Sequence, residues 1–149
     1  MPFVLGIDPA WTEREPSGIA LVEVEDTHSK VLCVAPSYQQ FIQESRRSDA
    51  VISLMRMAAS AERYYADQKS FTGATAAGLM GGTGSVDGYY TLAMTIDGGG
   101  QGYTASATPV AGKSQADDDC YAYLLTSTGL KSNQDSGGTE IPDPSCWPE

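Results

Sequence analysis

The chain has 149 residues, which suits one ordinary domain. Its 9 Lys and Arg residues against 19 Asp and Glu residues give a net charge of −10. This charge argues against direct binding of nucleic acid or of anionic membranes, because both need a cationic protein surface. A single histidine, His28, leaves little material for a His-rich metal site or a Ser–His catalytic pair. No run of about 18 apolar residues predicts a membrane span, and no signal-peptide pattern opens the chain.

Residues 1–34 have the character of short strands. Apolar and β-branched runs at 3–7, 18–24 and 31–34 predict three strands, separated by loops rich in Pro, Glu and Thr. Pro36 then ends this pattern, and the periodicity of the sequence changes. We therefore expect residues 1–34 to form a segment distinct from the rest of the chain.

A long helix is predicted from about residue 36 to residue 68, because apolar residues recur there every three or four positions. About thirty helical residues would span ~45 Å, well beyond a typical globular helix. One face is expected to be buried, and its residues are Val51, Leu54, Met55, Ala58, Ala61 and Tyr65. The opposite face is expected to carry the charges of Glu44, Arg46, Arg47, Asp49, Arg56, Glu62 and Arg63.

The remainder predicts a loop followed by an antiparallel sheet. Gly-rich sequence at 69–87 indicates a long loop. Four strands are predicted, at 89–96, 102–109, 120–126 and 130–132, the first two joined by a Gly-rich turn. One helix followed by antiparallel strands indicates an α+β fold, with the helix packed on one face of a four-stranded sheet. The strand residues expected against the helix are Tyr90, Leu92, Met94, Tyr121, Tyr123 and Leu125.

Three cysteines leave two arrangements open. Cys120 and Cys146 lie 26 positions apart in turn-rich sequence, whereas Cys33 stands alone near the start. The late pair forms either a loop-closing disulfide, in an oxidising compartment, or two free thiols, in a reducing one.

The densest acidic cluster is Asp117, Asp118 and Asp119. Three adjacent carboxylates are a weak candidate for a Ca²⁺ site, since they lack the alternating spacing of an EF-hand loop. The competing interpretation is a solvated turn before a strand. No cofactor is predicted anywhere in the chain.

Residues 36–149 also carry a series of short motifs in a fixed order. The predicted helix contains PSYQQF at 36–41, SRRSDA at 45–50 and AERYY at 61–65. The predicted strands and the C-terminal part contain GYYTL at 88–92, YTASATP at 103–109, QADDDC at 115–120 and CW at 146–147. In sequence and order these motifs resemble those of type IV pilins, most closely the PilE-like major and minor pilins of Gram-negative bacteria.

The resemblance implies a pilin globular domain over residues 35–149. Its parts would be a helix at about 36–68, a loop at 69–87, a sheet at 88–132 and a loop at 133–149 closed by a Cys120–Cys146 disulfide. It further implies a structural subunit of an extracellular pilus or fimbrium, not an enzyme. Adhesion, twitching motility and DNA uptake would be properties of the fibre, and electron transfer along the fibre also stays open.

Partners implied by the resemblance are other pilin subunits and the pilus assembly machinery, with no direct contact to nucleic acid. The stretch just after the membrane-spanning half of the family's helix packs against neighbouring subunits. In this sequence the residues that match it are Tyr38, Phe41, Ile42, Arg46 and Arg47.

The sequence departs from the family before Pro36, where a basic leader and an apolar half-helix are expected. Residues 1–34 resemble instead the opening strands of a ribonuclease H-like nuclease, with Asp8 of GIDP at the place of a metal-binding Asp. The further carboxylates of such a site do not follow, so we expect a fusion or foreign segment without nuclease activity. This form is expected to be a monomer or weak dimer without export, membrane insertion or fibres. The remaining alternative is a type II secretion pseudopilin, although such proteins usually carry a Ca²⁺ site in place of the disulfide loop.

Overall fold

The computed structural model describes residues 3–7, 19–25, 28–35, 38–141 and 146–147, with side chains from residue 41 onward. The chain divides into two compact units, residues 1–45 and residues 46–149.

The first unit contains a three-stranded antiparallel sheet in the order β1-β2-β3. Its strands are β1 (Phe3–Ile7), β2 (Ile19–Glu25) and β3 (His28–Ala35). β2 pairs with both neighbours, and its register with β3 shifts between Leu21 and Val22. The three predicted strands are therefore present, with β3 beginning three residues earlier than the apolar pattern suggested. The expectation for Asp8 concerns a residue outside the described part of the chain, and nothing is described of the Cys33 side chain.

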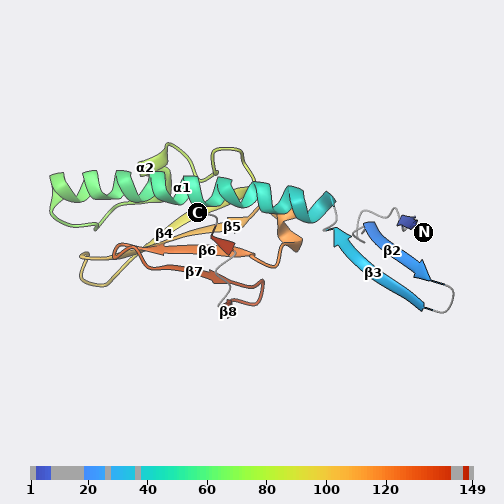
Figure 1. The fold of residues 1–149 in the computed structure, drawn as a ribbon. Helices are drawn as coiled ribbons and strands as arrows, with labels where there is room; N and C mark the ends of the chain where they lie inside the picture. The colour runs from blue at the N-terminus through green and yellow to red at the C-terminus, as the bar shows by residue number, and fades with distance from the viewer. Residues whose placement is uncertain (1–2, 8–18, 26–27, 36–37, 142–145, 148–149) are drawn as a thin grey trace. The chain divides into compact units, whose positions relative to one another are not determined.

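Helix α1 (Tyr38–Gln68) has 31 residues and confirms the long predicted helix. Within the second unit it lies along one face of the sheet (Figure 1). Ala50, Leu54, Met57 and Ala61 are fully buried, and their spacing of four, three and four residues follows one face of a helix. The prediction that Met55 is buried is wrong, because its side chain is 43% exposed. Met57 lies one turn after Leu54 and fills the core instead.

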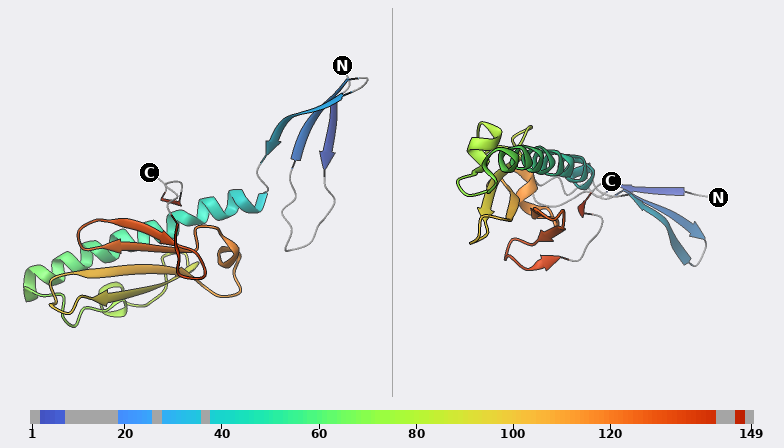
Figure 2. Two further views of the ribbon diagram at one scale, coloured as in Figure 1. Left: turned by 90° about the horizontal axis from the view of Figure 1, so that it is seen from below. Right: turned by 90° about the vertical axis from the view of Figure 1, so that its left-hand side faces the viewer.

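The sheet of the second unit has five antiparallel strands in sequential order. They are β4 (Tyr90–Ile96), β5 (Tyr103–Pro109), β6 (Ala122–Thr126), β7 (Lys131–Gln134) and β8 (Glu140–Ile141). The sequence predicted only four strands, because the two residues of β8 are too few to show an alternating pattern. The loop after α1 holds a short helix, α2 (Ala76–Met80), capped by the Thr75 side chain. Figure 2 shows the helix and the sheet as two layers.

The core of the second unit lies between α1 and the sheet. Strand β5 alternates buried and half-buried residues along its length, as a strand with one covered face does. Phe71 packs between the rings of Tyr65 and Tyr103, with centroid distances of 4.7 and 4.9 Å. The predicted residues Val51, Ala58, Tyr65 and Met94 are partly buried against this core, and Tyr90, Leu92, Tyr123 and Leu125 belong to it. Tyr121 precedes β6 and is only half-buried.

Candidate functional site

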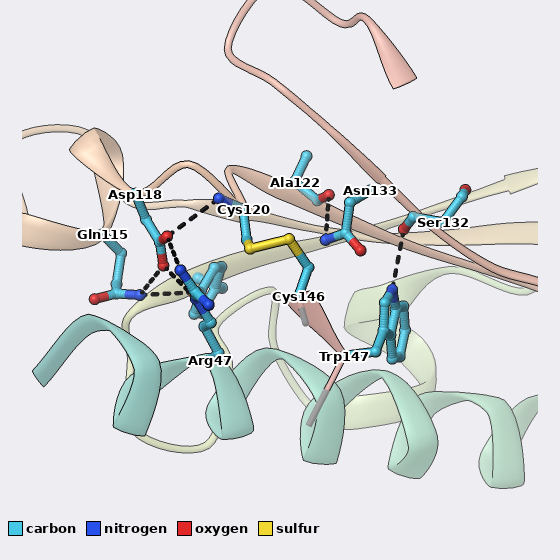
Figure 3. The surroundings of a disulfide bond; sticks show 10 residues. Arg47, Gln115, Asp118, Cys120, Ala122, Ser132, Asn133, Cys146 and Trp147 are labelled. Atoms are coloured by element: carbon cyan, nitrogen blue, oxygen red, sulfur yellow. Dashed lines mark hydrogen bonds and ion pairs between the residues drawn. A yellow bond between two sulfur atoms is a disulfide. The ribbon is translucent and has the colours of Figure 1, made fainter. Parts of the chain in front are cut away.

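A disulfide joins Cys120 to Cys146 and confirms the predicted pairing. Both cysteines are buried, and the bond joins positions 26 residues apart. It fastens the C-terminal Trp147 beside the sheet, where the indole N–H donates a hydrogen bond to the Ser132 carbonyl at 3.4 Å (Figure 3). The Trp147 ring also meets the Tyr123 ring edge to face at 5.6 Å.

Replacing both cysteines with serine should lower the free energy of unfolding by about 3 kcal/mol, because the unfolded chain regains the freedom of this loop. Urea unfolding followed by circular dichroism measures the change, and hydrogen exchange locates it. Exchange should accelerate in residues 131–147 more than in α1, which has its own buried face. Equal acceleration in both places would contradict the assignment of the bond to the C-terminal loop.

The middle residue of the acidic cluster, Asp118, is buried and paired with Arg47 of α1. The two guanidinium donors lie 2.7 and 3.1 Å from the two carboxylate oxygens. Asp118 also accepts hydrogen bonds from the Gln115 side chain and from the Cys120 backbone N–H, both at 3.1 Å. The solvated-turn interpretation is therefore wrong for this residue.

Its neighbours Asp117 and Asp119 are exposed, so the three carboxylates do not converge. Within the described part of the chain, no three His, Cys, Asp or Glu side chains gather in a way that could hold a metal ion.

Two buried tyrosines, Tyr90 and Tyr123, lie near the polar cluster formed by Arg47, Gln115 and Asp118. The Tyr90 hydroxyl accepts a hydrogen bond from the Gln115 side chain at 2.9 Å, and its ring meets Tyr123 edge to face at 5.7 Å. Burial raises the pKa of Tyr90 to about 12, against the opposing effect of the Gln115 hydrogen bond. Burial also raises the pKa of Tyr123. Both phenols therefore stay neutral at physiological pH and act as packing groups.

Asp49 is a second buried carboxylate, on a helix face where the sequence predicted solvent. It accepts hydrogen bonds from the Ser85 hydroxyl at 2.5 Å and from the backbone N–H groups of Asp87 and Tyr89 at 3.0 and 3.3 Å. These donors belong to the loop before β4, so Asp49 holds that loop against α1. No local pattern marked this residue, because Ser85, Asp87 and Tyr89 lie more than thirty positions away. The Ser53 hydroxyl, four positions on, also donates to Asp49, at 3.5 Å.

Arg46 contacts residues outside the helix, although the sequence predicted that its side chain faces solvent. Its guanidinium lies 4.4 Å from the centroid of the Tyr89 ring and donates a hydrogen bond to the Ser114 hydroxyl. The Lys113 ammonium lies 5.6 Å from the same ring centroid and donates to the Gly88 carbonyl at 2.9 Å. Two cations thus converge on one aromatic ring. The sequence predicted that Arg46 and Arg47 face solvent. Both instead make contacts within the subunit.

The outward face of α1 carries exposed apolar side chains. Phe41, Ile52 and Met55 are 66%, 49% and 43% exposed. They share one helix face with Ser45, Ser48 and Ala59, at alternating steps of four and three residues. Ile42 is half-buried. Tyr38 precedes residue 41, where the described side chains begin. No helix among the described residues combines the length and the apolar character needed to cross a membrane.

This helix-on-sheet unit with a disulfide-closed C-terminal loop has the fold of a type IV pilin. The structure is similar to a type IV pilin from Shewanella oneidensis, with a TM-score of 0.50 and 20% sequence identity over 72% of this chain and 99% of that chain. Residues 36–124 match the family described as "Type IV minor pilin ComP, DNA uptake sequence receptor", and the chain belongs to this family. No curated protein gives a match.

The family assignment confirms the predicted function at its general level. The protein is a structural subunit of a type IV pilus, and proteins of this class form extracellular pili. Its partners are accordingly other pilins, and the family implies a structural rather than an enzymatic protein.

Proposed function

We propose that this chain is a minor pilin that contacts DNA during its uptake by the pilus. The observation that carries the proposal is the match of residues 36–124 to the family described as a receptor of the DNA uptake sequence. This proposal replaces our expectation, drawn from the net charge of −10, that the protein makes no direct contact with nucleic acid. Net charge is a property of the whole chain, whereas a DNA contact uses the local potential of one surface.

The acidic composition still limits how the protein can bind. Repulsion between the chain and the phosphates opposes long-range attraction, so binding has to come from a few cations in direct contact with the DNA backbone. Base contacts would then supply any preference for one sequence. We therefore expect modest affinity, with a slope of log K against log[salt] set by the small number of these contacts.

Fluorescence anisotropy of a labelled short duplex, titrated with the full chain, tests this proposal. At low ionic strength we expect a Kd of about 10⁻⁴ M or tighter, weakening linearly on logarithmic axes as salt rises. Unlabelled duplexes of different sequence added as competitors measure sequence preference. Absence of binding up to that protein concentration at low salt would overturn the proposal.

We also propose that the exposed face of α1 packs against neighbouring pilin subunits. The resemblance implied such a contact for Phe41 and Ile42, together with Tyr38, Arg46 and Arg47. The exposed side chains of Ile52 and Met55 on the same helix extend this apolar surface. Steps of four and three residues are those by which helices pack along a shared seam, which supports the proposal.

A further inference from the structure

We propose that Arg46, Lys113 and Ser114, gathered around the ring of Tyr89, form a binding site for a phosphate of the DNA backbone. The inference rests on the proposed DNA contact and gives it a location on the protein. It also accounts for how an acidic chain could hold a polyanion.

Within the part of the chain that the structure describes, neither cation at this place is paired with a carboxylate. Among the described residues, the Arg47–Asp118 pair is the one ion pair with an N–O distance within 4.0 Å, so neither Arg46 nor Lys113 has such a partner there. Arg46 carries five N–H donors and Lys113 carries three. Arg46 uses one of these donors in its hydrogen bond to the Ser114 hydroxyl, and Lys113 uses one in its hydrogen bond to the Gly88 carbonyl. Donors therefore remain for an anion.

The cations are also held in position before any ligand arrives. Arg46 sits on a helix, and both cations lie over the half-buried ring of Tyr89. The Tyr89 backbone is in turn tied to α1 through the hydrogen bond from its N–H to buried Asp49. Ser114 lies beside Lys113 at the start of the 3₁₀ turn Ser114–Asp117 and touches Arg46. A preorganised cation pair loses less side-chain freedom on binding than two independent surface residues.

The other cations of this unit are less suited to the role. Arg47 is committed to buried Asp118, and Lys131 lies alone over the Trp147 ring at 5.3 Å. Arg56 and Arg63 are exposed on α1 as single charges. Lys69, just after α1, is exposed and donates to the Ala66 carbonyl at 2.7 Å. The exposed carboxylates of Asp87 and Asp117 lie near in sequence to the proposed site and weaken attraction at long range. A phosphate in direct contact with both cations is attracted to them strongly, because Coulomb attraction grows as the distance between charges falls.

The test compares two double variants of the full chain in the anisotropy assay. Arg46→Ala/Lys113→Ala removes the proposed site, and Arg56→Ala/Arg63→Ala makes the same change in net charge elsewhere. For the first variant we expect at least tenfold weaker binding at low salt. The slope of log K against log[salt] should also fall by about 2, since each cation that no longer meets a phosphate lowers it by about 1. The control should bind nearly as the unaltered chain does. The weakening should be the same for duplexes of different sequence, because phosphate contacts carry no base information.

Two further measurements separate the possible failures. Thermal unfolding checks that the variants are folded, and Arg46→Lys, which keeps the charge, should retain most of the binding. If the unaltered chain binds DNA but the two double variants behave alike, the site is wrong while the proposed function stands. If the unaltered chain binds no DNA, the proposed function itself fails. If the Arg46/Lys113 variant binds DNA normally but no longer enters pili, the site binds a carboxylate of a neighbouring subunit, and the DNA assignment is overturned.

Discussion

Replacing Arg47 with methionine is expected to lower the free energy of unfolding by about 3–5 kcal/mol. The side chain of Asp118 is only 1% exposed, whereas that of Arg47 is 14% exposed. Removing the arginine therefore leaves a buried carboxylate whose remaining donors, the Gln115 side chain and the Cys120 N–H, are neutral. Urea unfolding at pH 7, followed by circular dichroism, measures the change.

The matched control is Arg56→Met, which removes an exposed arginine from the same helix. It should change the free energy of unfolding by no more than about 0.5 kcal/mol. Adding Asp118→Asn to Arg47→Met should recover part of the stability, because the stranded charge is then gone. Equal effects of Arg47→Met and Arg56→Met would mean that the pair contributes nothing beyond an ordinary surface contact.

The sequence indicated the elements of the fold well because their periodicities are local. Steps of three and four residues identified α1, and alternation identified β4 and β5, to within a residue or two of their ends. The two-residue strand β8 shows no such pattern, because its place depends on pairing with β7. Within α1 the spacing of apolar residues placed Met55 on the buried face, whereas the buried methionine is Met57, two positions further along.

The polar residues were harder to place, for a related reason. Arg46, Arg47 and Asp49 look like one charged, solvent-facing stretch of helix, and all three turn instead toward partners in distant segments. Arg47 meets Asp118, which is 71 positions away. A buried charge is stable only with such a partner, and a local pattern contains no information about it. The disulfide, by contrast, was implied by the resemblance to pilins, because the two cysteines belong to motifs that could be recognised one by one.

Met57→Ala and Met55→Ala should differ clearly in their free energy of unfolding. The two substitutions are the same and lie two positions apart, but on opposite faces of α1. Met57 is fully buried beside Leu54, so its truncation should leave a cavity and cost about 2–5 kcal/mol of unfolding free energy, as should Leu54→Ala. Met55 and Phe41 are 43% and 66% exposed, so each truncation should cost less than about 1 kcal/mol. Urea unfolding of the four variants measures these differences.

The incorporation of Met55→Ala and Phe41→Ala into pili can be measured as well. These two variants should lose little stability but be incorporated poorly. If the outward face of α1 packs against neighbouring subunits, Met55→Ala and Phe41→Ala should reduce incorporation of the folded protein while leaving its stability nearly intact. A charged variant, Met55→Asp, should do so more strongly, because an unpaired carboxylate would be buried in the contact. Normal incorporation of Met55→Asp would remove this face from the contact between subunits. A large drop in the stability of Met55→Ala would instead place Met55 in the core, as its spacing from Val51 and Ala58 first suggested.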